Sequence, residues 1–123
     1  MAHRVPEDEV REDRIIFEIV VDAHDDTERA MGWYYYLQDE LKTPFAAICR
    51  TSRSTSPLKV GEKVEVLAMA SEDDCMSEVH VLVRHGKSRL AVPLGQLECQ
   101  SPSEDTCQAV ADWHYWQARG YEY

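Results

Sequence analysis

Carboxylate side chains crowd into three short segments of this sequence, and carboxylate oxygens are the hard ligands that Ca²⁺ prefers in proteins. The segments are residues 22–28, residues 72–74, and residues 104–112, in which Glu104, Asp105 and Asp112 stand. Crowded carboxylates repel one another, and a divalent cation relieves that repulsion. Because Ca²⁺ takes about six to eight oxygen ligands, no single segment completes a coordination sphere without water or another segment. We therefore expect segments that are distant along the chain to converge.

Each acidic segment also has a purely structural interpretation. Asp25 and Asp26 suit a helix cap and its first turn, where negative charge is favourable. Residues 72–74 suit a solvated turn between two strands, and Glu104 with Asp105 suits the start of a helix. The residues alone leave both interpretations open. The spaced acidic loop of an EF-hand, with its glycine and distant glutamate, cannot be placed anywhere in the sequence.

The residue types that carry catalysis occur without the spacing that catalysis needs. The five histidines form no HExxH motif, and there is no GxSxG turn or glycine-rich phosphate loop. Cys75 follows Asp73 and Asp74, whose negative charges disfavour a nucleophilic thiolate. His24, as a nitrogen donor, is a poor calcium ligand. The sequence therefore predicts a protein that is not an enzyme.

Four cysteines are present, at positions 49, 75, 99 and 107. They form no CxxC pair, and their separations of 26, 24 and 8 residues match none of the common zinc sites. The favoured interpretation is that they are reduced and serve as small buried hydrophobic residues. A redox or metal-binding role is the alternative.

The chain has 123 residues and a net charge of −10, and the excess acid lies at its two ends. Residues 1–30 hold ten acids and four bases, and residues 98–123 hold five acids and one base. Such ends repel nucleic acid and anionic membranes, and they attract multivalent cations or a basic protein. No apolar run is long enough for a membrane span or a signal peptide, so we expect a cytoplasmic protein.

The elements that must position the acidic segments are helices at both ends and short strands between them. We expect an α+β fold of one domain, with residues 1–14 frayed, residues 15–41 helical, a small SH3-like β-barrel over 45–97, and a C-terminal helix over 102–118. Residues 15–21 fit a helix or a strand. Within the next helix, Ala30, Trp33, Leu37 and Leu41 form an apolar stripe at helical spacing, and Gly86 predicts a tight hairpin turn over 85–88. The aromatic runs 33–36 and 113–116 predict packing of helices on the barrel, because basic residues that could hold phosphates are almost absent there.

One long motif is specific enough to indicate a family. Residues 18–37 (EIVVDAHDDTERAMGWYYYL), together with 64–75, 91–94, 111–116 and 120–123, resemble the cyanobacterial calcium-binding protein family known as CcbP. The resemblance implies a small acidic cytoplasmic protein that binds Ca²⁺ without an EF-hand, as a calcium buffer or a regulator of calcium signalling. The chain departs from the family pattern at His24, where a tyrosine is usual, and in the serine-rich connector 51–57.

The resemblance also selects candidate calcium ligands, at positions where the motif coincides with clustered carboxylates. They are Asp22, Asp25, Asp26, Glu28, Glu72, Asp73 and Asp74, with Asp39, Glu40, Asp105 and Asp112 as second-rank candidates. The alternative function is an SH3-like interaction module whose acidic surface binds a basic protein segment without any metal.

Overall fold

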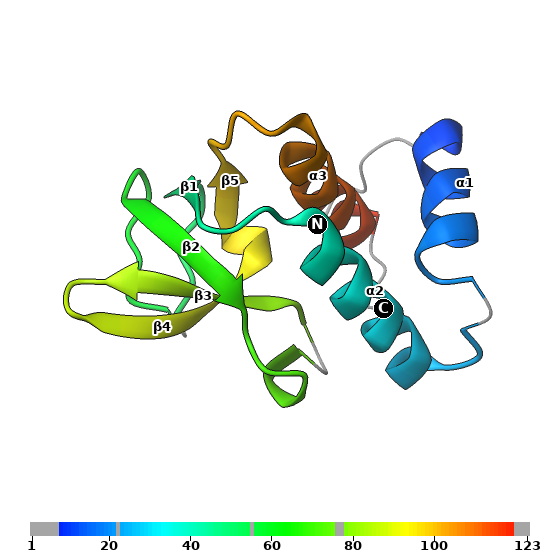
Figure 1. Cartoon of the computed structure of the whole chain (residues 1–123), viewed down its shortest axis with the longest axis horizontal. Coiled ribbons are helices and arrows are strands. Elements are labelled where there is room, and N and C mark those ends of the chain that lie inside the picture. Colours follow the sequence, from blue (N-terminus) through cyan, green and yellow to red (C-terminus); the bar gives the residue numbers. More distant parts are fainter. Residues whose placement is uncertain (1–7, 22, 55, 76–77, 120–123) are drawn as a thin grey trace.

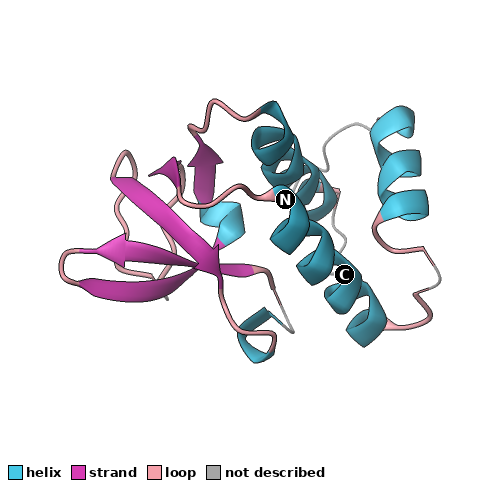
Figure 2. Ribbon diagram, in the orientation of Figure 1, coloured by secondary structure: helices cyan, strands magenta, loops and turns pink. Residues whose placement is uncertain are grey.

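The chain folds into three helices and one five-stranded antiparallel sheet (Figures 1 and 2). The computed structural model describes residues 8–21, 23–54, 56–75 and 78–119. The helices are α1 (Glu9–Glu18), α2 (Asp26–Glu40) and α3 (Glu104–Ala118). The strands are β1 (Phe45–Cys49), β2 (Lys63–Met69), β3 (His80–His85), β4 (Ser88–Pro93) and β5 (Leu97–Cys99), and short 3-10 turns, η1 (Asp73–Cys75) and η2 (Leu94–Gln96), precede β3 and β5. The predicted α+β class is confirmed.

The strands lie in the order β4-β3-β2-β1-β5, so β4 and β5 are the two edges of an open sheet. Gly86 has a φ of 62° in the tight turn between β3 and β4, which confirms the predicted hairpin. Within the part of the chain that the structure describes, β4 does not pair with β5. The last strand also extends to Cys99, beyond the predicted limit of residue 97.

Helix α1 begins earlier than the sequence predicted. Residues 9–14 were expected to fray, but Asp8 caps the helix by accepting a hydrogen bond from the Arg11 backbone amide at 3.0 Å. Ile15 is fully buried and anchors the helix to the core. At its end α1 approaches α2 closely, since a Cβ atom on Gly32 would clash with the Ile19 carbonyl oxygen. Residues 15–18, for which the sequence fits either a helix or a strand, are helical.

The core lies between the sheet and the paired helices α2 and α3, with α1 on the far side of that pair (Figure 1). Trp33 of α2 and Trp113 of α3 are fully buried, and their rings meet edge to face with centroids 5.1 Å apart. The predicted apolar stripe of α2 is buried along its whole length: Ala30, Trp33, Leu37 and Leu41. The aromatic runs thus serve packing, as predicted. No described helix is long and apolar enough to cross a membrane.

His114 of α3 makes the stability of this fold depend on pH. Burial, and then the nearby Arg50 charge, lower the pKa of His114 from 6.5 to about 4, so the folded chain keeps it neutral. The unfolded chain binds a proton there below pH 6.5, and stability is therefore lost as the pH falls from about 6.5 to about 4. At pH 5 the expected loss is about 2 kcal/mol. Urea unfolding of wild type and His114→Gln at pH 7 and pH 5 measures it.

The His114→Gln variant should lose less stability than wild type over this interval, because glutamine does not titrate. Exposed carboxylates contribute equally to both proteins, and the comparison removes their effect. Equal losses in the two proteins would contradict the assignment of this pH dependence to His114.

Candidate metal centre

The acidic segment at the start of α2 forms a helix cap. Asp25 is the N-cap residue, and its Oδ1 accepts a hydrogen bond from the Glu28 backbone amide at 2.8 Å. Glu28 Oε2 in turn accepts from the His24 backbone amide at 3.1 Å, as in a capping box shifted by one residue. Asp26 forms an ion pair with Arg29. All three carboxylates are exposed, and their negative charge is favourable at this end of the helix.

The second acidic segment, residues 72–74, lies between β2 and β3 and overlaps the 3-10 turn η1. Glu72 Oε1 accepts a hydrogen bond from the Tyr35 hydroxyl of α2 at 3.3 Å. Beneath this contact Tyr34 packs against Ala70 and Cys75. The segment is therefore held against α2, while the side chains of Glu72, Asp73 and Asp74 remain exposed.

The first segment lies at the N-terminal end of α2, and the second contacts the same helix further along its axis, at Tyr35. Tyr35 lies nine residues after Asp26, which corresponds to about 14 Å along a helix axis. Among the described residues no three His, Cys, Asp or Glu side chains form a group that could hold a metal ion. Asp22 lies outside the described residues. The predicted convergence of both segments on one ion therefore stays a prediction.

The second-rank candidates differ sharply in their surroundings. Asp112 is fully buried, and its Oδ1 lies 2.5 Å from Arg14 Nη2 and 3.4 Å from Arg11 Nε. Its Oδ2 accepts a hydrogen bond from the Tyr36 hydroxyl at 2.8 Å. Both oxygens are engaged by protein groups, so Asp112 connects α1, α2 and α3. Asp39 and Asp105 are exposed, and Glu40 is half-buried.

The Asp112 cluster also shifts the pKa values of its partners. The hydrogen bond with Asp112 raises the pKa of Arg14, which therefore stays charged. Burial, and then the hydrogen bond to Asp112, raise the pKa of the Tyr36 hydroxyl, which stays protonated as a donor. The cluster is thus a charged structural network and not a vacant set of oxygen ligands.

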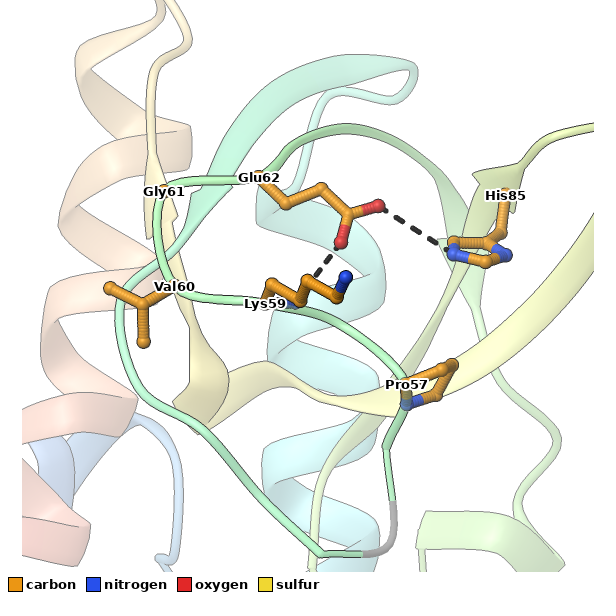
Figure 3. Close-up of a pocket in the computed structure, with 6 residues that line it drawn as sticks. All are labelled: Pro57, Lys59, Val60, Gly61, Glu62 and His85. Atoms are coloured by element: carbon orange, nitrogen blue, oxygen red, sulfur yellow. Dashed lines mark hydrogen bonds and ion pairs between the residues drawn. The ribbon is translucent and has the colours of Figure 1, made fainter.

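A hollow of about 630 Å³ lies at the other end of the molecule, beside the turn between β3 and β4. Figure 3 shows Glu62 facing both its neighbours there: Oε1 accepts from the Lys59 backbone amide at 3.0 Å, and Oε2 lies 3.6 Å from His85 Nε2. Among the residues that line the hollow, Glu62 is the acidic one, and Lys59 carries a positive charge. This chemistry is unfavourable for Ca²⁺, which needs several oxygen ligands.

The contact between Tyr35 and Glu72 is not evident from the sequence. The tyrosine run suggested core packing, and the exposed second tyrosine, Tyr35, carried no signal that pointed to a loop 37 residues away. A tyrosine on the polar face of an amphipathic helix is the one feature that could have indicated it.

Comparison with known proteins identifies close relatives over the whole chain. A family model described as calcium binding, Calci_bind_CcbP, matches residues 13–117. The crystal structure of Anabaena CcbP has 46% sequence identity, covers 100% of both chains and superimposes with a TM-score of 0.85. A structure described as a calcium binding protein in the calcium-binding form has 43% identity, covers 94% of this chain and 95% of the other, and gives a TM-score of 0.83. No curated protein matches the sequence.

Proposed function

We propose that this chain, which belongs to the CcbP family of calcium-binding proteins, binds Ca²⁺ through the carboxylates of residues 22–28 and 72–74. The observation that carries the proposal is the 43% identity, over 94% of the chain, to a protein whose structure is described as a calcium-binding form. The candidate ligands are Asp22, Asp25, Asp26, Glu28, Glu72, Asp73 and Asp74.

The hydrogen bonds of these segments are compatible with an ion. Asp25 accepts through Oδ1, Glu28 through Oε2 and Glu72 through Oε1, so each bond uses one carboxylate oxygen and orients the other. Exposed carboxylates retain their water, and Ca²⁺ readily combines protein oxygens with water ligands. Each segment can therefore contribute a few oriented oxygens, and water completes the sphere.

The biological role that fits this chemistry is calcium buffering or calcium signalling in the cytoplasm, without catalysis. A net charge of −10 concentrates cations around the molecule, and binding lowers that charge. We further propose that the open five-stranded sheet is a variant of the SH3-like barrel. The negative charge favours a basic protein segment as a partner. In a pull-down with excess chelator, binding that persists is independent of metal, and binding that is lost depends on calcium.

Replacing Asp73 with Asn and Asp74 with Ser should weaken calcium binding about tenfold or more, because two charged oxygen ligands are lost. Calorimetric titration with Ca²⁺ in excess Mg²⁺ measures the change. The matched control is Glu65→Gln with Glu98→Gln, which removes the same charge from exposed positions on the sheet. The control should bind nearly as tightly as wild type. An isotherm unchanged by the Asp73 and Asp74 substitutions would move the ligands away from this segment.

A further inference from the structure

Two of the four cysteines meet where the sheet joins α3. Cys99 ends β5, and Cys107 lies in the first turns of α3. Their Sγ atoms are 2.7 Å apart, and both side chains are half-buried. A covalent disulfide has a sulfur separation of about 2.05 Å, so a small movement would bring these thiols into bonding distance.

The backbone around the two thiols holds them in place. Cys99 sits opposite Ala47 in the β1–β5 ladder. The Ser101 amide donates to Cys99 Sγ at 3.4 Å, and Cys107 Sγ lies 3.4 Å from the Ser101 carbonyl oxygen. The Ser103 hydroxyl caps α3 by accepting from the Thr106 amide at 3.2 Å. A strand and a capped helix therefore fix both ends of the short connection.

We propose that Cys99 and Cys107 form a reversible disulfide site, which a low-molecular-weight disulfide such as glutathione disulfide oxidises. The Cys107 thiolate attacks one sulfur of the oxidant, a proton is released, and one glutathione thiolate leaves. Cys99 then loses its proton and attacks the Cys107 sulfur of the mixed disulfide. The second glutathione leaves, and one intramolecular S–S bond replaces the S–S bond of the oxidant.

The order of attack follows from the environment of Cys99. Burial raises the pKa of the Cys99 thiol, which makes it a poor first nucleophile. Cys99 lies next to the Cys107 sulfur and resolves the mixed disulfide.

The other two cysteines provide internal controls. Cys49 and Cys75 are each only 1% exposed. Cys49 Sγ donates to the Thr51 carbonyl oxygen at 3.2 Å, and Cys75 Sγ donates to the His80 carbonyl oxygen at 3.4 Å. Buried thiols of this kind react slowly with a bulky disulfide.

Trypsin separates these groups, so mass spectrometry tests the proposal directly. Cys99 and Cys107 share the tryptic peptide 90–119, while Cys49 lies in peptide 43–50 and Cys75 in peptide 64–84. After the reduced full chain is treated with glutathione disulfide and then capped with iodoacetamide in denaturant, peptide 90–119 should be uncapped and about 2 Da lighter than its reduced form. Peptides 43–50 and 64–84 should be capped. Dithiothreitol should restore capping of peptide 90–119.

A peptide 90–119 that is fully capped, or that carries glutathione on both cysteines, would overturn the proposal. Cys107→Ser should abolish the loss of 2 Da, whereas Cys49→Ala should retain it. The oxidised wild type should also melt about 5–10 °C above the reduced protein, because the bond closes a short loop. An unchanged melting temperature of the fully oxidised protein would contradict a disulfide that links β5 to α3.

Discussion

The Asp112→Ala variant should lose about 3–5 kcal/mol of unfolding free energy, the largest effect that we expect from a single substitution. Asp112 is fully buried, and its carboxylate neutralises Arg14 at 2.5 Å while accepting the Tyr36 hydroxyl at 2.8 Å. Removal leaves the guanidinium and the hydroxyl without this partner and opens a cavity between three helices. Urea unfolding measures the loss, and the fluorescence of buried Trp33 and Trp113 reports it.

Two further variants separate charge from packing at this position. Asp112→Asn keeps the shape and one oxygen acceptor, so its loss should be smaller than that of the alanine variant. Glu98→Gln removes an exposed carboxylate and should change stability by less than about 0.5 kcal/mol. An Asp112→Ala protein as stable as Glu98→Gln would show that the buried network does not stabilise the fold.

Calcium should raise the thermal stability of the wild-type protein strongly. A ligand that binds only the folded chain adds about 2.7 kcal/mol at a free concentration of one hundred times Kd, which corresponds to a rise in Tm of about 10 °C for a domain of this size. The physical reason is that the unfolded chain does not hold the acidic segments in oriented positions. Differential scanning calorimetry in chelator and in excess Ca²⁺ measures the shift.

The same experiment has two controls. Excess chelator should reverse the shift, and Mg²⁺ at the same concentration should produce a smaller one, because Mg²⁺ gives up its water reluctantly. Equal melting temperatures in chelator and in Ca²⁺ would contradict binding that is confined to the folded state.

Local sequence signals predicted most of the elements. Asp25 caps α2 as predicted, the apolar stripe of that helix is buried, and Gly86 forms the hairpin turn. The predicted start of α1 was wrong, because the dense run of charged residues before residue 15 is also typical of a frayed chain end. Its cap, Asp8, is an ordinary local signal, but the helix is also held by tertiary bonds, such as that from the Asp8 amide to the Tyr115 hydroxyl at 2.8 Å.

Long-range contacts explain what the sequence could not predict about the site. Asp112 looked like one acidic residue among several, and only the fold brings Arg14 to it across 98 positions. Cys99 and Cys107 match no motif, since their pairing needs the geometry of a strand end and a capped helix. The acidic segments themselves are evident in the sequence. The position at which residues 72–74 contact α2 is not, because it depends on the hydrogen bond between Tyr35 and Glu72.

The most direct test is a calorimetric titration of the chelator-stripped full chain with Ca²⁺ in excess Mg²⁺. We predict saturable binding of at least one ion, weakened when Asp25 and Glu28 are replaced by Asn and Gln or when residues 73 and 74 are neutralised. Heats no larger than dilution for the wild-type chain would contradict calcium binding at these carboxylates.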